Sequence, residues 1–284
     1  AGYDPREMAG VFEMLGRVSG GEGAGGLPSW LSTHPAPEDR RERTEAQVAA
    51  DPSPPNAIVG RESFLRRLDG LVYGEDPRQG FFEDARFLHP TLEFQLDFPE
   101  GWRTANQRQA VLAMSPEQDA LIQLTIAAAP GEDAEAAAAA QVASPAAGRT
   151  AAMTAARNFI AESGFSTTAP AAAAVNGLPA SVLDFVATTE SGEVRGRATF
   201  IAHGGRVFLL LAYGPSGAWA ERRAVAETAV ASFRPLTDPA VLGLEPRRIR
   251  IVELDAPTTL AEIARTRRGV RATVEELALL NGVE

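Results

Sequence analysis

An alternating run of residues near the middle of the chain most constrains the fold. From Leu92 to Phe98, apolar residues at 92, 94, 96 and 98 alternate with polar ones. Because successive side chains of a β-strand point to opposite faces, this pattern predicts a strand with one buried face. The segment 99–102, Pro-Glu-Gly-Trp, then predicts a turn. The chain is therefore expected to form a sheet from about residue 86 onward.

The residues after this strand continue the same kind of pattern. Further strands are predicted at 110–114, 121–128, 180–188, 195–202 and 206–213. Helices are predicted at 133–142, 150–162 and 218–233, with Pro145 and Gly148 separating the first two. In the last helix, Val225, Ala229 and Phe233 are expected to share a buried face. The fold class predicted for residues 86–236 is thus α+β, an antiparallel sheet packed by helices.

The flanking segments have different compositions. Residues 1–48 predict two helices, which are too short to bury a core alone. Residues 49–85 predict a linker, rich in Pro at 52–55, and a connecting helix. After a second linker, residues 247–284 predict a small strand-helix-helix unit.

Composition and motifs exclude several classes of function. The chain of 284 residues has no Cys, which excludes disulfides, thiolate metal sites and a cysteine nucleophile. Its formal charge of −10 argues against nucleic-acid binding, and no apolar run is long enough to span a membrane. His34, His89 and His203 are the only histidines, and H-E-x-x-H, G-x-S-x-G and P-loop motifs are absent. We interpret His89 and His203 as structural, and an independent hydrolase built on the α+β domain would need a polar cluster that the sequence does not show.

The string Trp-Leu-Ser-Thr-His-Pro-Ala-Pro-Glu-Asp-Arg at 30–40 resembles the S-T-H-P-x-x-x-x-R segment of zinc metallopeptidases of the BepA and HtpX kind. The opening Ala-Gly-Tyr-Asp-Pro at 1–5 resembles the start of the helix that follows the third zinc ligand in that family, and residues 64–80 resemble its post-catalytic region. The resemblance implies that His34 is an auxiliary, switch-like zinc ligand and Arg40 a cleft-facing residue of the catalytic site. An added protein ligand displaces the water that a catalytic zinc activates, so its departure would switch the enzyme on. The alternative is that His34 is an ordinary surface residue beside a helix cap.

The same resemblance implies that the zinc-binding half, including H-E-x-x-H, lies in an N-terminal peptidase domain upstream of Ala1. Zinc is then expected in the full-length protein, and no cofactor is expected in this chain, which alone is predicted to be inactive. The absence of an initiator Met at Ala1 fits this expectation.

Two further resemblances concern the rest of the chain. The element order of 86–236 and its Phe-Pro-Glu-Gly-Trp turn resemble the PsbP/Mog-like fold, and we interpret Trp102 as a core residue. Residues 250–282 resemble a LysM module, which implies a glycan groove that includes Thr259, Leu260 and Asn281. The usual Gly-Asp before Thr-Leu is replaced here, and the sequence stops before a second strand, so a small structural cap is the equal alternative.

These features together predict an accessory and regulatory C-terminal region of a periplasmic or otherwise extracytoplasmic bacterial zinc metalloendopeptidase. Its role would be to dock envelope proteins or peptidoglycan and to supply a regulatory zinc ligand. The alternative is a stand-alone envelope adaptor that binds glycan or protein.

Overall fold

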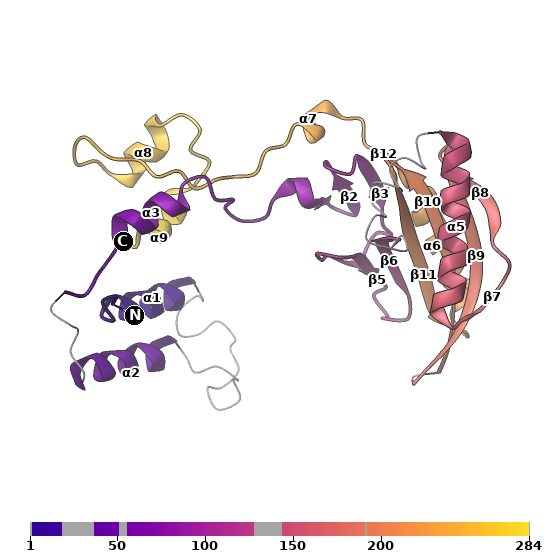
Figure 1. Ribbon diagram of the computed structural model, residues 1–284, viewed down its shortest axis with the longest axis horizontal. Coiled ribbons are helices and arrows are strands. Elements are labelled where there is room, and N and C mark those ends of the chain that lie inside the picture. The colour runs from indigo at the N-terminus through magenta and orange to yellow at the C-terminus, as the bar shows by residue number, and fades with distance from the viewer. Residues whose placement is uncertain (1, 19–36, 51–55, 128–143, 191, 284) are drawn as a thin grey trace. The chain divides into compact units, whose positions relative to one another are not determined.

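The computed structural model describes residues 2–18, 37–50, 56–127, 144–190 and 192–283 (Figure 1). The chain divides into two compact units, one formed by residues 75–246 and the other by residues 1–74 together with 247–284. The first unit is an antiparallel sheet packed by helices, which confirms the predicted α+β class. No helix within the described residues is long and apolar enough to cross a membrane.

The large sheet of residues 75–246 is antiparallel, with the strand order β4-β5-β6-β11-β10-β9-β7, and β8 also pairs with β9. Its strands are β4 (Arg103–Asn106), β5 (Val111–Met114), β6 (Leu121–Ile126), β7 (Ser166–Thr167), β8 (Ala171–Val175), β9 (Leu178–Thr189), β10 (Gly192–His203) and β11 (Arg206–Pro215). The three long strands β9, β10 and β11 form the meander expected from the turn residues between them. Apolar side chains of these strands point to both faces of the sheet, so each face must pack against another element.

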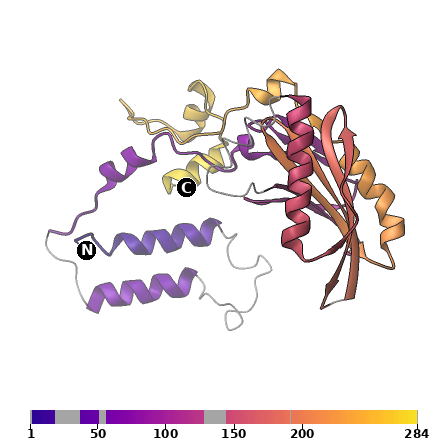
Figure 2. The ribbon, with the colours of Figure 1, turned by 45° about the vertical axis from the view of Figure 1, so that its right-hand side comes forward.

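Helix α5 (Pro145–Ser163) covers one face of the sheet (Figure 2). The break expected at Gly148 is wrong, because the helix already begins at Pro145, where Ser144 caps it by accepting the amide of Ala147. Gly148 lies inside the helix, where an added Cβ would meet Pro179 Cγ at 3.0 Å. Gly148 therefore lets the helix pack closely against Pro179 and does not interrupt the helix. The helix expected at 133–142 lies outside the described residues.

Helix α6 (Trp219–Ala231) and a small antiparallel sheet cover the opposite face. The small sheet has the order β1-β2-β3-β12, and its strands are β1 (Phe81–Glu83), β2 (Arg86–His89), β3 (Phe94–Asp97) and β12 (Arg234–Pro235). Phe94 stacks on Phe233 with ring centroids 5.1 Å apart and contacts Phe208 at 4.9 Å. The expectation that Val225 shares the buried face of α6 is wrong: it is 39% exposed, and Ala226, Ala229 and Val230 face the core. The other two residues predicted on that face, Ala229 and Phe233, are buried as expected.

In the other unit, the described residues of 1–74 and 247–284 form the helices α1 (Glu7–Val18), α2 (Pro37–Ala50), α3 (Arg61–Leu68), α8 (Leu260–Thr266) and α9 (Val274–Asn281). A parallel bridge joins Tyr3 to Ile58, and an antiparallel bridge joins Val72 to Arg248. Of the strand expected at 248–254, only the bridge between Val72 and Arg248 is present. Two short helical turns, η1 (Pro77–Gln79) and α7 (Pro239–Leu242), lie near the two ends of the segment 75–246.

A candidate binding site beneath helix α6

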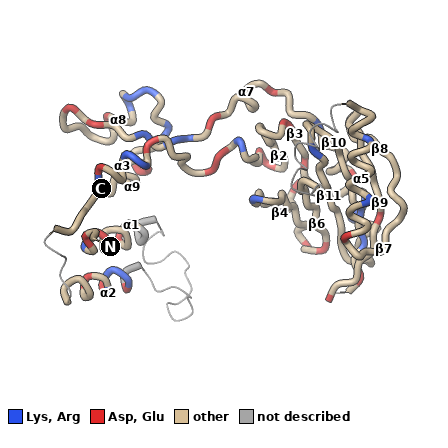
Figure 3. The backbone as a smooth tube through the Cα atoms, viewed as in Figure 1, with Lys and Arg blue, Asp and Glu red and all other residues tan. Residues whose placement is uncertain are grey.

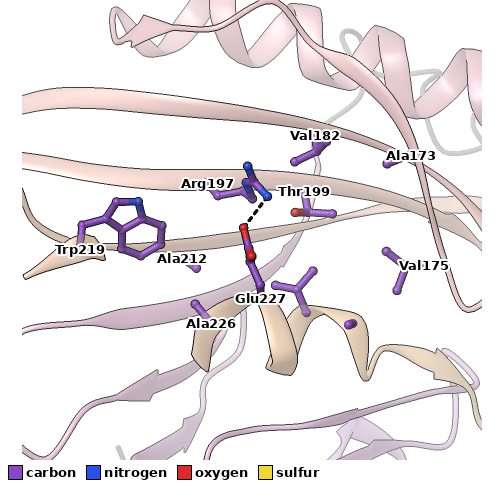
Figure 4. Close-up of a pocket in the computed structure, with 11 residues that line it drawn as sticks. Ala173, Val175, Val182, Arg197, Thr199, Ala212, Trp219, Ala226 and Glu227 are labelled. Carbon is purple, nitrogen blue, oxygen red and sulfur yellow. Dashed lines mark hydrogen bonds and ion pairs between the residues drawn. The ribbon is translucent and has the colours of Figure 1, made fainter. Parts of the chain in front are cut away.

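A cavity of about 220 Å³ lies between α6 and the large sheet (Figure 4). Strands β8 to β11 form one wall and α6 the other. The lining residues are Ala173, Val175, Val182, Arg197, Thr199, Ala212, Trp219, Ala226, Glu227, Val230 and Ala231. Ala231 at the end of α6 is exposed, so this end of the cavity reaches the surface.

Small side chains on both walls explain why the space is not filled. Helix α6 presents Ala226 and Val230 to the sheet, and the sheet presents Ala173 and Ala212. Close packing in protein interiors leaves few voids, because facing positions usually combine large and small residues. Here small residues face small residues, and the large side chain, Trp219, lies at the N-terminal end of the helix.

Helix α6 is fixed over this space at both ends. Arg222 donates two hydrogen bonds to Asp119 Oδ2, at 3.1 and 2.9 Å, and one to Glu117. Near the other end, Asn176 Nδ2 donates to the carbonyl oxygens of Ala231 and Phe233 at 2.7 and 2.8 Å. The cavity therefore exists without help from a ligand.

A network of charged side chains forms one side of the cavity. Arg197 of β10 donates to both carboxylate oxygens of Asp184 on β9, at 2.7 and 3.1 Å, and to Glu227 of α6. Arg223 also donates to Glu227 at 2.9 Å. The hydrogen bonds from Arg197 hold the pKa of Asp184 below its ordinary value. With two arginines and two carboxylates, this network is electrically neutral.

Thr199 places a hydroxyl group in the apolar part of the cavity. The residue is 4% exposed and lies one alternation along β10 from Arg197. Its side chain makes no hydrogen bond to any described residue, whereas Ser181, the buried hydroxyl residue on the neighbouring strand, donates to the carbonyl of Ala171. Because no fully buried side-chain oxygen or nitrogen among the described residues lacks a partner, the Thr199 hydroxyl oxygen is open to water in the cavity.

A second hollow of about 490 Å³ lies beside the small sheet. His89 lines it, and burial lowers the pKa of this imidazole to about 4. Its Nδ1 accepts the amide hydrogen of Leu92 at 3.2 Å, so the neutral ring carries its proton on Nε2. Polar residues of the 106–109 turn line the same hollow, and Asn106 is held by a 2.7 Å hydrogen bond to the carbonyl of Gly80.

The residues singled out from the sequence lie elsewhere. His34 is outside the described residues, and Arg40 lies half-buried on α2. Thr259 caps α8 by accepting the amide of Glu262, Leu260 is the first residue of that helix, and Asn281 donates to the carbonyl of Leu277. Both polar side chains of the expected glycan groove are thus engaged within their own helices.

His203 and Trp102, interpreted from the sequence as structural and core residues, lie in the α+β unit. His203 bonds through Nε2 to the carbonyl of Glu93 at 2.9 Å, and Trp102 packs against the core. Among the described residues there is no group of three or more His, Asp or Glu arranged to hold a metal ion.

Sequence reasoning missed Arg197, Thr199 and Glu227. A signal for two of them was present, because polar residues at 195, 197 and 199 alternate with small or apolar ones in a strand that is otherwise apolar. That pattern indicates a polar stripe on one face of β10.

A family model for the serine/threonine kinase C-terminal domain matches residues 89–235, more than half of the chain. The chain belongs to this family. The serine/threonine kinase C-terminal domain includes all residues that line the cavity beneath α6 and the Asn176 and Arg222 contacts that fix the helix. No curated protein matches the sequence.

Several solved structures are similar to part of the chain. A Bacteroides thetaiotaomicron protein shares 12% identity over 55% of this chain, with a TM-score of 0.38, and the match spans half of that protein. CyanoP, the cyanobacterial PsbP of Synechocystis, shares 13% identity over 54% of this chain and 94% of its own, with a TM-score of 0.37. LpqN of Mycobacterium tuberculosis shares 14% identity over 51% and 83%, with a TM-score of 0.30. All three TM-scores lie below 0.5, so these likenesses carry no functional weight.

Proposed function

We propose that the chain is the non-catalytic C-terminal region of a cell-envelope zinc metallopeptidase. In this proposal the α+β domain docks substrate proteins or the cell wall, and His34 supplies a regulatory zinc ligand. The observation that carries it is the exposure of apolar side chains in residues 1–74, next to the motifs at 1–5 and 30–40 that resemble the peptidase family.

Helix α1 and its flanks bury almost nothing. Tyr3 is 66% exposed, and Met8, Val11 and Met14 on α1 are exposed as well. Asp4 is the one buried side chain among the described residues of 1–74 and 247–284. An amphipathic helix whose apolar face is open to water indicates a missing partner surface. We assign that partner to the zinc-binding half of the peptidase, because the AGYDP segment starts the helix that follows a zinc ligand in that family.

The family match supports an accessory rather than a catalytic role for residues 89–235. The matching family is named for its position at the C-terminus of serine/threonine kinases. The printed sequence contains neither H-R-D nor D-F-G, two motifs that kinase catalysis needs. A domain of this kind therefore accompanies a catalytic domain without supplying its reacting groups.

Docking to the cell wall is supported by charge in the LysM-like segment. Four arginines, at 265, 267, 268 and 271, lie in or near the connection between α8 and α9 (Figure 3). A cationic connection suits the carboxylate groups that peptidoglycan carries.

The test is to isolate the native protein from its own cells with an antibody against residues 75–246. We expect an intact mass well above 30.0 kDa, about one zinc per chain, and peptidase activity that a chelator abolishes. His34→Ala in that protein is expected to raise basal peptidase activity several-fold, and His203→Ala, in the α+β domain, serves as the matched control. A zinc-free species near 30 kDa would overturn the proposal in favour of the envelope adaptor. A heavier species with phosphoryl-transfer activity would overturn it in favour of a kinase.

A further inference from the structure

We propose that the cavity beneath α6 binds a neutral, mainly apolar small molecule that carries one hydrogen-bonding group, of the size and polarity of a monocyclic phenol. The site lies wholly within residues 173–231. It does not rest on the identity of the parent protein, so it is tested separately from the proposed function.

The volume sets the size of the ligand. An engineered apolar cavity of about 150 Å³ in another protein takes up benzene. The cavity beneath α6 is larger, at about 220 Å³. By proportion it holds about eight or nine non-hydrogen atoms, which matches one aromatic ring with two small substituents.

The walls set the polarity of the ligand. Apolar side chains from α6 and the sheet dominate the lining, and Trp219 offers an aromatic surface at one end. The Thr199 hydroxyl makes no hydrogen bond to a described residue and lines the cavity, so a ligand hydroxyl placed beside it would replace its hydrogen bond to water. A largely apolar lining with one convergent polar group is typical of small-molecule sites.

The charged network sets the charge of the ligand. Arg197 is already hydrogen-bonded to Asp184 and Glu227, so it has little capacity left for a further anion. A carboxylate ligand would lie close to Glu227, and an ammonium ligand would lie close to Arg197. A charged ligand of either sign would lose its hydration on entering a site whose own charges are already paired. A neutral ligand is therefore favoured.

The fixed position of α6 favours binding. Because Asn176 and Arg222 hold the helix at its two ends, the ligand does not have to open the domain or order a loop. A site formed in advance loses less free energy to reorganisation.

The experiment uses the full chain and titrates para-cresol while the indole N–H resonance of Trp219 is followed by NMR. Trp219→Phe assigns that resonance, and Trp102, which does not line the cavity, is the internal reference. We expect a saturable shift with a Kd below about 1 mM. Toluene is expected to bind about threefold to tenfold more weakly, because it lacks the hydroxyl, and 4-methylbenzoate is expected to give no saturable shift.

Two variants locate the site. Ala226→Leu fills the cavity and is expected to abolish the shift, whereas Ala224→Leu, on the exposed side of the same helix, leaves it unchanged. Thr199→Val is expected to weaken the binding of para-cresol about threefold to tenfold and to leave the binding of toluene unchanged. Any one of three results would overturn the proposal. These are the absence of a saturable shift up to the solubility limit, undiminished binding to A226L, and an equal loss of affinity for both ligands in T199V.

Discussion

Residues 75–246 bury many aromatic and aliphatic side chains, whereas the described residues of 1–74 and 247–284 bury almost none. In the first unit Phe87, Phe94 and Phe233 are fully enclosed, and two buried clusters cover both faces of the large sheet. In the second unit Phe64 is 60% exposed and Tyr3 66% exposed. Both units contain regular helices, so helix formation alone does not indicate an independent domain. Burial of apolar surface gives the first unit a core of its own, and we propose that the second unit needs a partner because its described residues have none.

The largest predicted effect compares one phenylalanine from each unit. Phe94→Ala removes a fully buried ring that contacts Phe208 and Phe233, and it should lower the free energy of unfolding by about 3–5 kcal/mol. Phe64→Ala should change it by no more than about 0.5 kcal/mol. Urea unfolding monitored by circular dichroism measures both. A similar loss for the two variants would show that residues 1–74 share the core.

The next effect concerns glycines. An added Cβ at Gly196 would meet Phe185, Tyr213 and a backbone carbonyl within 2.6 Å, so Gly196→Ala should cost about 1–3 kcal/mol. Gly10 in α1 has nothing within 4 Å of the added Cβ, and there Gly→Ala should stabilise the helix by about 0.5–1 kcal/mol. Gly217→Ala, also with open space, is the control in the α+β unit. Thermal unfolding tests all three, and equal effects at Gly10 and Gly196 would contradict the contrast between the units.

Between about pH 4 and pH 6.5, a pH effect is predicted for the α+β unit. Burial lowers the pKa of His89 to about 4, and the unfolded chain has an ordinary value near 6.5. Between these values the unfolded state binds a proton that the folded state does not, so the His89 contribution is complete above pH 6.5 and is lost as the pH falls toward 4. The carboxylate of Asp184, whose pKa is lowered by Arg197, affects stability only below about pH 4.

The expected loss from His89 between pH 7.5 and pH 5 is about 1 kcal/mol, after allowance for its partial exposure to solvent. Urea unfolding at the two pH values measures it. His89→Asn keeps an acceptor for the Leu92 amide and should remove most of this pH dependence. An unchanged pH dependence in H89N would place the titrating group elsewhere.

The smallest effect concerns the contact between the two segments of the other unit. Arg247 binds Glu276 at 3.1 and 3.2 Å and lies over the Tyr73 ring. Because the pair is solvent-exposed, Arg247→Ala should cost less than about 1 kcal/mol. The expected readout is a rise of about fivefold or less in amide exchange at 70–73 and 247–249, with Arg268→Ala as control. A much larger rise would show that this pair organises the unit.

Periodicity was enough to predict the meander and the α+β class, because long alternating strands joined by Gly-rich turns leave little choice of fold. The short strands β1, β4, β7, β8 and β12 were missed, since two to five residues carry no measurable period. Val225 was wrongly placed on the buried face of α6, because Ala and Val lie so close together in this helix that several faces look equally apolar.

The candidate site was less predictable than the fold. Arg197 and Thr199 could be seen as a polar stripe on one strand, but their relation to Glu227 requires α6 to fold back over the sheet. A cavity depends on which small residues face each other, and sequence spacing does not contain that information. The motifs at 1–5 and 30–40 together led to a prediction for His34, and that prediction stays untested because His34 lies outside the described residues.

Hydrogen exchange over the full chain tests the central contrast most directly. We expect the slowest amides to lie in β9, β10 and β11 and to exchange only on global unfolding, while amides of α1 and α9 exchange at least about a thousandfold faster. If α1 were protected as strongly as β10, residues 1–74 would have a core of their own. The claim that they need a partner would then be contradicted.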